Sequence, residues 1–335
     1  MRQIEANQFA EYFATHTQWI DVRAPIEFKA GAIPEAINLP LLDDEERHLI
    51  GIAYKQQGRD VAIDLGQRMV SGELHEARLQ AWLRAAENPA AVIYCFRGGL
   101  RSQTVQTWLR ERGVDVPVVN GGYKRLRRHL MEALVARAGL LEFQVVSGLT
   151  GSGKTAFLHA SGKPFIDLED LAAHRGSAFG AVERSQPTQI DFENALALAL
   201  LRAPTDQGPI LIENESRRIG KCVVPESLFS KILSSPRLQL EVGFETRVEN
   251  IFKDYVLDSV LGRQGDAARF AEFQSSLRAI SRKLGGLRTQ EIMQDLAHSE
   301  WEFRSGGGLE SNRVWIRKLL EWYYDPLYRK IGLPS

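Results

Sequence analysis

Residues 148–155 follow the pattern G-x-x-x-x-G-K-[ST] without a mismatch. The pattern stands directly after the apolar stretch Phe143–Ser147 and before a helical stretch, which is the context of a phosphate-binding loop. Its glycines would let backbone amides surround phosphate oxygens, Lys154 would reach the terminal phosphates, and the Thr155 hydroxyl would ligate Mg²⁺. The predicted diphosphate-binding residues are Gly148, Gly151, Ser152, Gly153, Lys154 and Thr155.

The acidic partner for Mg²⁺ has two candidates in the sequence. A strand-like stretch at 209–213 ends in Glu213, and Asp167 follows the apolar pair Phe165–Ile166. An ordinary nucleotide-hydrolysing site places an Asp at the end of such a strand, so Glu213 at that position weakens the case for simple hydrolysis. The loop itself binds any diphosphate, because its amides recognise phosphate oxygens rather than a base.

A second reactive constellation runs from Tyr94 to Ser102. An apolar strand leads into Cys95, and a helix is expected to begin near Arg101. Loop amides, the two arginines and the helix dipole would together stabilise a thiolate, which is a good nucleophile and can carry a chalcogen. The predicted catalytic residues are Cys95, Arg97 and Arg101, with Gly98, Gly99 and Ser102 forming the anion cradle. Cys222 has no such cradle and is interpreted as structural.

These loops need parallel sheets to position them. Short apolar stretches at 19–23, 90–94 and 116–119 alternate with helical patterns at 74–86 and 102–112. The same alternation returns after residue 140, with strands at 143–147, 164–168, 209–213 and 238–242 and a helix at 189–202. Strands that alternate with helices favour an α/β fold with parallel sheets.

The chain divides into four segments by pattern. We expect a first α/β domain at 1–125, a basic linker helix at 126–139, a phosphate-loop domain at 140–245, and a helical extension at 246–335. In the linker helix, Leu126, Leu130, Leu134 and Ala138 recur at helical spacing, so one face of it should be buried.

Composition limits the class of protein. The chain has 335 residues, and its 42 Lys and Arg residues balance 42 Asp and Glu residues. That balance argues against a protein that coats nucleic acid through summed positive charge. Two cysteines make no disulfide framework, and no long apolar stretch indicates a signal peptide or a membrane span, so we expect a cytoplasmic protein. The sequence does not indicate an oligomeric state.

The first 125 residues resemble the rhodanese family. Its first signature is matched by Asp21-Val22-Arg23, by Glu27-Phe28 and by residues 31–38. The Cys95 loop matches the second segment, and residues 120–123, Asn-Gly-Gly-Tyr, match the third. Two positions depart from the family. Ala32 replaces the usual His, and Arg101 lies six positions after Cys95, a longer loop that is typical of related phosphatases and arsenate reductases with larger tetrahedral anions.

The whole chain resembles the tRNA 2-selenouridine synthase family. The Cys95 loop, the 148–155 loop and residues 174–180, His-Arg-Gly-Ser-Ala-Phe-Gly, carry this resemblance. It implies a transferase that replaces the sulfur of wobble 2-thiouridine in tRNA by selenium. The implied substrates are geranyl diphosphate, which makes an S-geranyl intermediate, and selenophosphate, which a supplying enzyme provides.

The resemblance gives each loop a role. Lys154 and Thr155, with Mg²⁺, would stabilise the departing diphosphate, and the Cys95 loop would hold selenophosphate. Whether a covalent Cys–selenium intermediate forms is left open. The helical C-terminal region is expected to line the pocket for the prenyl chain.

A tRNA substrate requires basic surface. Two segments without acids are candidates for tRNA phosphates: Lys124, Arg125, Arg127 and Arg128, and Arg278, Arg282, Lys283 and Arg288. Charge runs are also common on solvated faces. Trp301, Trp315, Trp322, Tyr323 and Tyr324 could stack bases, but such spacing is more often helix core.

Two functions of other classes remain. The long Cys95 loop also fits a phosphatase, arsenate reductase or sulfurtransferase fused to an ATP-using domain, and phosphate release from an aryl phosphate without tRNA would favour it. A small-molecule kinase with an inactive rhodanese-like module is the other alternative, and an active Cys95 argues against it.

Overall fold

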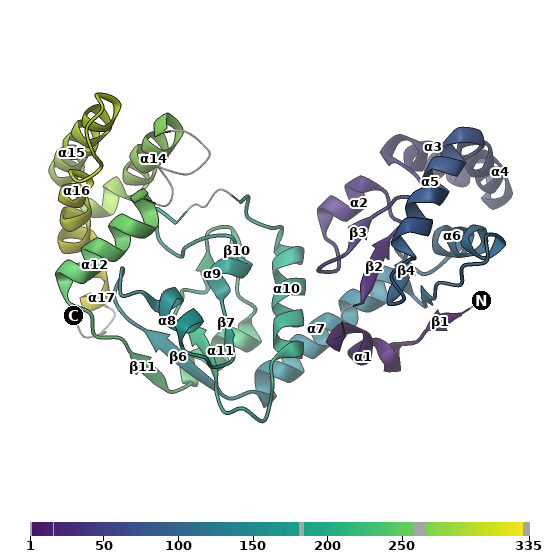
Figure 1. Ribbon diagram of the computed structural model, residues 1–335, viewed down its shortest axis with the longest axis horizontal. Helices are drawn as coiled ribbons and strands as arrows, with labels where there is room; N and C mark the ends of the chain where they lie inside the picture. Colours follow the sequence, from purple (N-terminus) through teal and green to yellow (C-terminus); the bar gives the residue numbers. More distant parts are fainter. Residues whose placement is uncertain (1, 16, 181–183, 258–265, 331–335) are drawn as a thin grey trace. The chain divides into compact units, whose positions relative to one another are not determined.

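The computed structural model describes residues 2–15, 17–180, 184–257 and 266–330. These described residues divide into two compact units (Figure 1). The first unit comprises Met1–Leu140 together with Pro187–Ala203, and the second comprises Leu141–Gln186 together with Pro204–Ser335. No helix within the described ranges combines the length and apolar character needed to cross a bilayer.

A parallel sheet forms the centre of the first unit. Within its described residues the strands have the order β1-β5-β4-β2-β3, and every pair is parallel. Their bounds are Gln3–Ile4, Val118–Val119, Ala91–Tyr94, Gln18–Asp21 and Ile37–Asn38, in that order. The strands β2 and β4 are almost entirely buried, as expected for a parallel sheet covered by helices. The predicted α/β class is confirmed.

Helices surround this sheet. They are α1 (Phe9–Ala14), α2 (Pro25–Ala30), α3 (Asp44–Gln57), α4 (Arg59–Met69), α5 (Gly72–Ala85), α6 (Leu100–Glu111) and α7 (Gly122–Leu140). The α3–α4 pair was not predicted. Asp43 starts α3 with a capping box, in which its carboxylate accepts from the Glu46 amide at 2.8 Å, and Gly58, at φ +93°, separates the two helices.

Helix α10 (Gln189–Arg202) belongs to the first unit, although its residues fall within the 140–245 segment of the sequence. It packs along α7, where the predicted buried face of that helix is confirmed. The buried Asn194 amide donates to the Ala32 carbonyl at 2.6 Å and accepts from Arg127, also at 2.6 Å. A contiguous division of the sequence could not show this return to the first unit, because the contacts join positions more than sixty residues apart.

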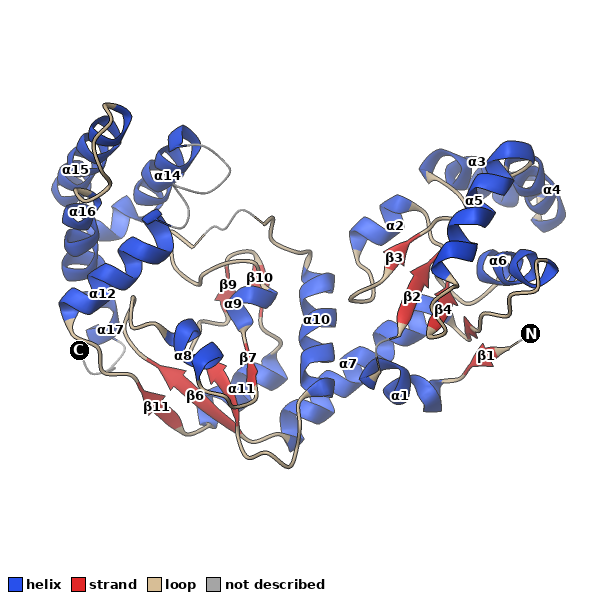
Figure 2. Cartoon of the chain, viewed as in Figure 1, coloured by secondary structure: helices blue, strands red, loops and turns tan. Residues whose placement is uncertain are grey.

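The second unit holds its own parallel sheet, with the order β11-β6-β8-β7 among the described residues. The strands are Arg237–Gln239, Phe143–Ser147, Ile210–Glu213 and Phe165–Ile166. Helices α8 (Lys154–Ala160) and α11 (Glu226–Ser234) pack beside them (Figure 2). The short helix α9 (Leu168–Leu171) follows β7, and β9 (Arg218–Ile219) pairs antiparallel with β10 (Cys222–Val223).

The C-terminal part is helical, as predicted. It contains α12 (Phe244–Ile251), η2 (Phe252–Leu257), α14 (Asp266–Leu284), α15 (Gly286–Arg304), α16 (Asn312–Leu319), η3 (Leu320–Tyr324) and α17 (Asp325–Lys330). Trp315 and Tyr323 are buried in the core of these helices, whereas Trp301 is exposed. The aromatic residues at 315 and 323 are therefore core residues rather than a platform for bases.

A buried ion pair connects the sheet of the first unit to its loops. The Arg23 guanidinium donates to both carboxylate oxygens of Asp21, at 2.7–3.0 Å, and to the Gly31 carbonyl at 2.8 Å. Its carbon lies 3.8 Å from the ring centre of Tyr123, and both members of the pair are buried. The carbonyls of Asp21 and Arg23 both accept from the Asn38 side chain. Through their side chains and carbonyls, Asp21 and Arg23 thus join β2 to the end of α2, to β3 and to the start of α7.

Replacing Asp21 by Asn should reduce the free energy of unfolding of the first unit by about 3–5 kcal/mol, because the Arg23 guanidinium would stay buried without a counter-charge. Urea-induced unfolding followed by circular dichroism measures the loss. Asp64→Asn, on an exposed position of α4, is the control and should change stability by less than about 0.5 kcal/mol. Equal effects of the two changes would contradict the role of the pair.

Candidate functional site

Cys95 lies where β4 ends, and it is nearly buried, with 3% of its surface exposed. Its sulfur lies 3.2 Å from the Ser102 hydroxyl and 3.9 Å from the Gly99 carbonyl oxygen. Helix α6 begins at Leu100, close to the start predicted near Arg101 and Ser102. The short loop therefore places the thiol beside the first turn of a helix, where helix amides favour a negative charge.

The start of α7 fixes the shape of this loop. The Tyr123 amide donates to the Cys95 carbonyl at 2.8 Å, and the Lys124 amide donates to the Phe96 carbonyl at 3.1 Å. Gly98 has φ +66°, and a Cβ there would lie 2.6 Å from the Gly121 nitrogen. Only glycine allows so close an approach of two backbones at a positive φ. The second and third rhodanese-like segments therefore form one packed structure.

The two loop arginines differ in their surroundings. Arg101 makes a bidentate ion pair with Glu27, at 2.5 and 3.1 Å, and Arg47 contacts the same carboxylate at 3.1 Å. Burial opposes ionisation of Glu27, but its hydrogen bond to Arg101 and the charges of both arginines outweigh this and lower its pKa. Arg97 is exposed and lies 5.9 Å from the ring centre of Phe96. Among the described residues, Arg97 is thus the loop arginine that forms no ion pair with a carboxylate.

The phosphate-binding loop connects β6 to α8 in the second unit. Gly151 and Gly153 have φ of +83° and +72°, conformations that turn the backbone around a central space. The Lys154 amine lies 3.9 Å from a carboxylate oxygen of Glu215, and the Thr155 hydroxyl donates to Glu213 at 2.8 Å. The loop therefore places Lys154 and Thr155 on one side, each next to an acid.

Three glutamates gather around this loop: Glu169, Glu213 and Glu215. Burial and then neighbouring carboxylates raise the pKa of Glu169 to about 9 and that of Glu213 to about 7. Burial alone would lower the pKa of Lys154, but the charges of Glu215 and its other acidic neighbours raise it. The cluster therefore contains more carboxyl groups than one lysine balances, and without a further cation the raised pKa values keep part of it protonated.

Of the two acids that the sequence offered for Mg²⁺, Glu213 contacts Thr155. Asp167 instead caps α9, because its carboxylate accepts from the Asp170 amide at 2.7 Å, and it lies 3.1 Å from His159. Within the described ranges no three His, Cys, Asp or Glu side chains form a metal cage. Mg²⁺ does not require one, since it keeps several waters and takes phosphate oxygens in such loops. Thr155, Glu213 and the neighbouring carboxyl groups, which a cation would allow to ionise, fit that ion.

A cavity of about 1360 Å³ opens beside the phosphate loop. Residues 174–177 line one side of it, and Tyr324, Leu327 and Tyr328 of the C-terminal helices line another. Gly176 has φ +52°, and a Cβ there would lie 2.7 Å from a carboxylate oxygen of Glu169. The segment at 174–180 is therefore held close to the acidic cluster, and the cavity combines a polar wall with an aromatic one.

The comparisons with known proteins agree with both loops. A model described as the tRNA 2-selenouridine synthase AAA domain matches residues 141–331, and a rhodanese-like domain matches residues 5–129. A tRNA 2-selenouridine synthase of Nitrosomonas europaea is 43% identical over 94% of this chain and 89% of its own length. One of Alcanivorax borkumensis is 45% identical, covering 96% and 91%.

The chain belongs to the tRNA 2-selenouridine synthase family.

Membership in this family confirms both resemblances and the predicted order of the two domain types. Among solved structures, the N-terminal domain of an ATP/GTP binding protein from Clostridium difficile 630 aligns with 34% of this chain and 89% of its own. It is 36% identical with a TM-score of 0.31, a value too low to support an argument.

The basic residues of this family member have unequal environments. Arg127 pairs with Glu193, and Arg125 lies 3.6 Å from Glu5. Lys124 and Arg128 are exposed and have no ion pair in the described part of the chain. In the second segment Arg278, Arg282, Lys283 and Arg288 are all exposed, Lys283 lines the phosphate-loop cavity, and Arg288 lies 5.5 Å from the ring centre of Trp322.

For three residues of the site, the sequence alone did not predict a role. Glu27 was part of a signature but had no role there, and Glu169 and Glu215 were not candidates. The Glu-Asn-Glu run at 213–215 was the available signal for Glu215, since alternate residues at a strand end point the same way. Nothing local indicated Glu27, whose partner Arg101 lies 74 positions away.

Proposed function

We propose that this chain replaces sulfur by selenium in wobble 2-thiouridine of tRNA, in a geranylation step and a selenation step. The supporting observation is the presence of two separate loops, one around Cys95 and one around Lys154, whose sequences and backbone geometry suit anions, in a chain of the tRNA 2-selenouridine synthase family. Two chemically different steps would use two such sites.

The first step is assigned to the phosphate loop. The thiouridine sulfur attacks C1 of the geranyl chain, the C–O bond to diphosphate breaks, and the N3 proton leaves as the alkylated base becomes neutral. Lys154 would stabilise the charge that develops on diphosphate, and bound Mg²⁺, held near Thr155 and Glu213, would supply further compensation. Tyr324, Leu327 and Tyr328 offer an apolar wall to the geranyl chain, in the helical region expected from the sequence.

The second step is assigned to the Cys95 loop. Selenium, positioned by the Cys95 thiolate, leaves phosphorus as selenide while water supplies the fourth oxygen of phosphate. Selenium then bonds to C2, the C2–S bond breaks, and geranylthiol leaves with a proton. No oxidant is needed. Arg97 and the loop amides would hold selenophosphate, and Glu27 would orient Arg101 toward the same loop.

Replacing Lys154 by Ala should slow geranylation by at least about 10²-fold, the scale of losing one positioned electrostatic group. Selenation of tRNA that is already geranylated should continue, because diphosphate takes no part in it. Mass spectrometry of tRNA nucleosides measures both steps, and Lys163→Ala, at an exposed loop position, is the control. Loss of selenation with intact geranylation would contradict the assignment.

Replacing Cys95 by Ser should abolish selenouridine formation and leave geranylation intact, so that geranylated tRNA accumulates. A hydroxyl remains protonated where a thiol can ionise. Cys222→Ser is the matched control, since Cys222 is similarly buried but lies in the hairpin β9–β10 of the second unit and does not line the phosphate-loop cavity. Selenouridine formation at the normal rate by the Cys95→Ser protein would refute the role of this residue.

The basic segments are proposed to bind tRNA phosphates. The double change Lys124→Gln and Arg128→Gln should weaken tRNA binding and reduce the slope of log K against log salt by roughly 0.7–0.9 per lost contact. Filter binding at several salt concentrations measures the slope. Lys29→Gln, at an exposed position of α2, should leave it unchanged. An unaltered slope in the double variant would make these residues an ordinary solvated face.

A further inference from the structure

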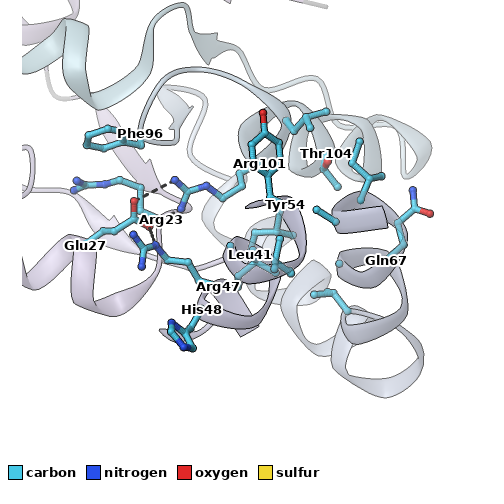
Figure 3. A pocket seen from close by; sticks show the side chains of 18 of the residues that line it. Arg23, Glu27, Leu41, Arg47, His48, Tyr54, Gln67, Phe96, Arg101 and Thr104 are labelled. Atoms are coloured by element: carbon cyan, nitrogen blue, oxygen red, sulfur yellow. Dashed lines mark hydrogen bonds and ion pairs between the residues drawn. The ribbon is translucent and has the colours of Figure 1, made fainter. Parts of the chain in front are cut away.

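A second large cavity lies wholly in the first unit, next to the Cys95 loop (Figure 3). Its volume is about 1370 Å³, and α3, α4, α5 and α6 contribute to its walls. Phe96, Leu100 and Arg101 bring the Cys95 loop and the start of α6 to its edge. Nothing in the proposed selenophosphate site requires such a volume, since pockets for drug-sized molecules occupy only about 300–1,000 Å³.

The lining of this cavity is largely hydrocarbon. Its apolar side chains include Leu41, Leu42, Ile50, Ile52, Ile63 and Val70. Several apolar side chains on its wall are solvent-exposed, among them Ile52, Tyr54 and Leu100. Exposed apolar side chains gathered in one concave place mark a binding site rather than ordinary surface. The α3–α4 pair supplies much of this lining, so these two helices build much of the cavity.

The charged side chains that Figure 3 labels, Arg23, Glu27, Arg47 and Arg101, lie toward one end, the polar end. Figure 3 shows Arg23, Glu27 and Phe96 together there, with Tyr54, Gln67 and Thr104 toward the other end. The ion pairs of Glu27 with Arg101 and Arg47 lie at the polar end. A ligand that matches this arrangement has a polar head near the Cys95 loop and a hydrocarbon tail that extends between α3, α4 and α6.

We propose that this cavity binds the geranyl group of S-geranyl-2-thiouridine during selenium transfer. The proposal rests on the proposed function. Charge alone does not separate a geranyl thioether from a free prenyl diphosphate here, because Glu27 balances only one of its two arginine neighbours and Lys55 and Arg59 also line the cavity. The position of the cavity favours the thioether, because it lies beside the Cys95 loop, to which selenium transfer is assigned. With the geranyl tail in the cavity, the C2–S bond would lie at the loop that holds Cys95.

This placement assigns the tail a role in departure of the leaving group. Geranylthiol is released as a long hydrocarbon chain with a small polar end. An apolar cavity that already holds the chain excludes water from the C2–S bond. The same cavity would hold the geranylthiol product when the C2–S bond breaks. Binding energy from a remote apolar group would thus position the reacting carbon.

Ile52→Asp and Leu49→Asp test the proposal as a matched pair. Both residues lie on α3 with similar exposure, 38% and 41%, but only Ile52 lines the cavity. Ile52→Asp should raise KM for selenation of geranylated tRNA roughly tenfold or more, because a carboxylate would face the hydrocarbon chain. Geranylation by this variant should be normal, so geranylated tRNA should accumulate, whereas Leu49→Asp should behave as the unaltered protein.

A substrate series gives a measurement that does not depend on how a variant folds. On the unaltered protein, tRNA carrying S-dimethylallyl in place of S-geranyl should show KM at least about tenfold higher, since each lost methylene weakens apolar binding about fourfold. Equal KM values, or equal behaviour of the two variants, would overturn the cavity assignment while leaving two-step selenation intact. Loss of geranylation in Ile52→Asp would also overturn it, by showing that the cavity serves the free prenyl diphosphate. Absence of geranylated tRNA with the unaltered protein would instead refute the proposed function itself.

Discussion

The buried pair of Arg23 and Asp21 is the interaction on which the first unit depends. A guanidinium without water must find all its partners in the protein, and Arg23 finds them in a strand end, a helix-terminal carbonyl and the face of Tyr123. Because the Tyr123 amide also holds the Cys95 carbonyl, the charge pair and the cysteine loop share one support. The D-x-R signature therefore has a structural reason that is separate from the chemistry of the thiol.

The phosphate loop of the second unit presents the opposite electrostatic problem. Here glutamates outnumber the lysine beside them, and burial makes their ionisation costly, as the raised pKa values of Glu169 and Glu213 show. An arrangement of this kind gains from a bound cation, which neutralises the acids and the diphosphate together. A Glu at the position where a nucleotide-hydrolysing site has Asp thus belongs to a larger acidic group, and its identity alone says little about the reaction.

Sequence reasoning succeeded where the determining interactions are local. Both loops follow from glycines and functional residues within nine positions, and the buried face of α7 follows from apolar residues four apart. It failed where distant contacts decide. The placement of α10 depends on Asn194 meeting Ala32, and the environment of Arg101 depends on Glu27. The α3–α4 pair was missed for another reason: its apolar residues face a cavity as well as the core, which blurs the one-sided pattern of an ordinary amphipathic helix.

In the proposed two-step reaction, a prenyl group makes physical sense as a temporary attachment on sulfur. Alkylation turns a poor leaving group into a thiol, but a methyl group would achieve that as well. A ten-carbon chain adds apolar surface, and each proposed step would bury that surface, against the aromatic wall near Lys154 and in the hydrocarbon cavity near Cys95. Neither loop would then have to recognise the alkylated base by the polar edges of the base alone. The hydrocarbon chain would add an apolar group that the protein binds without using charge, which suits a neutral protein whose substrate is a polyanion.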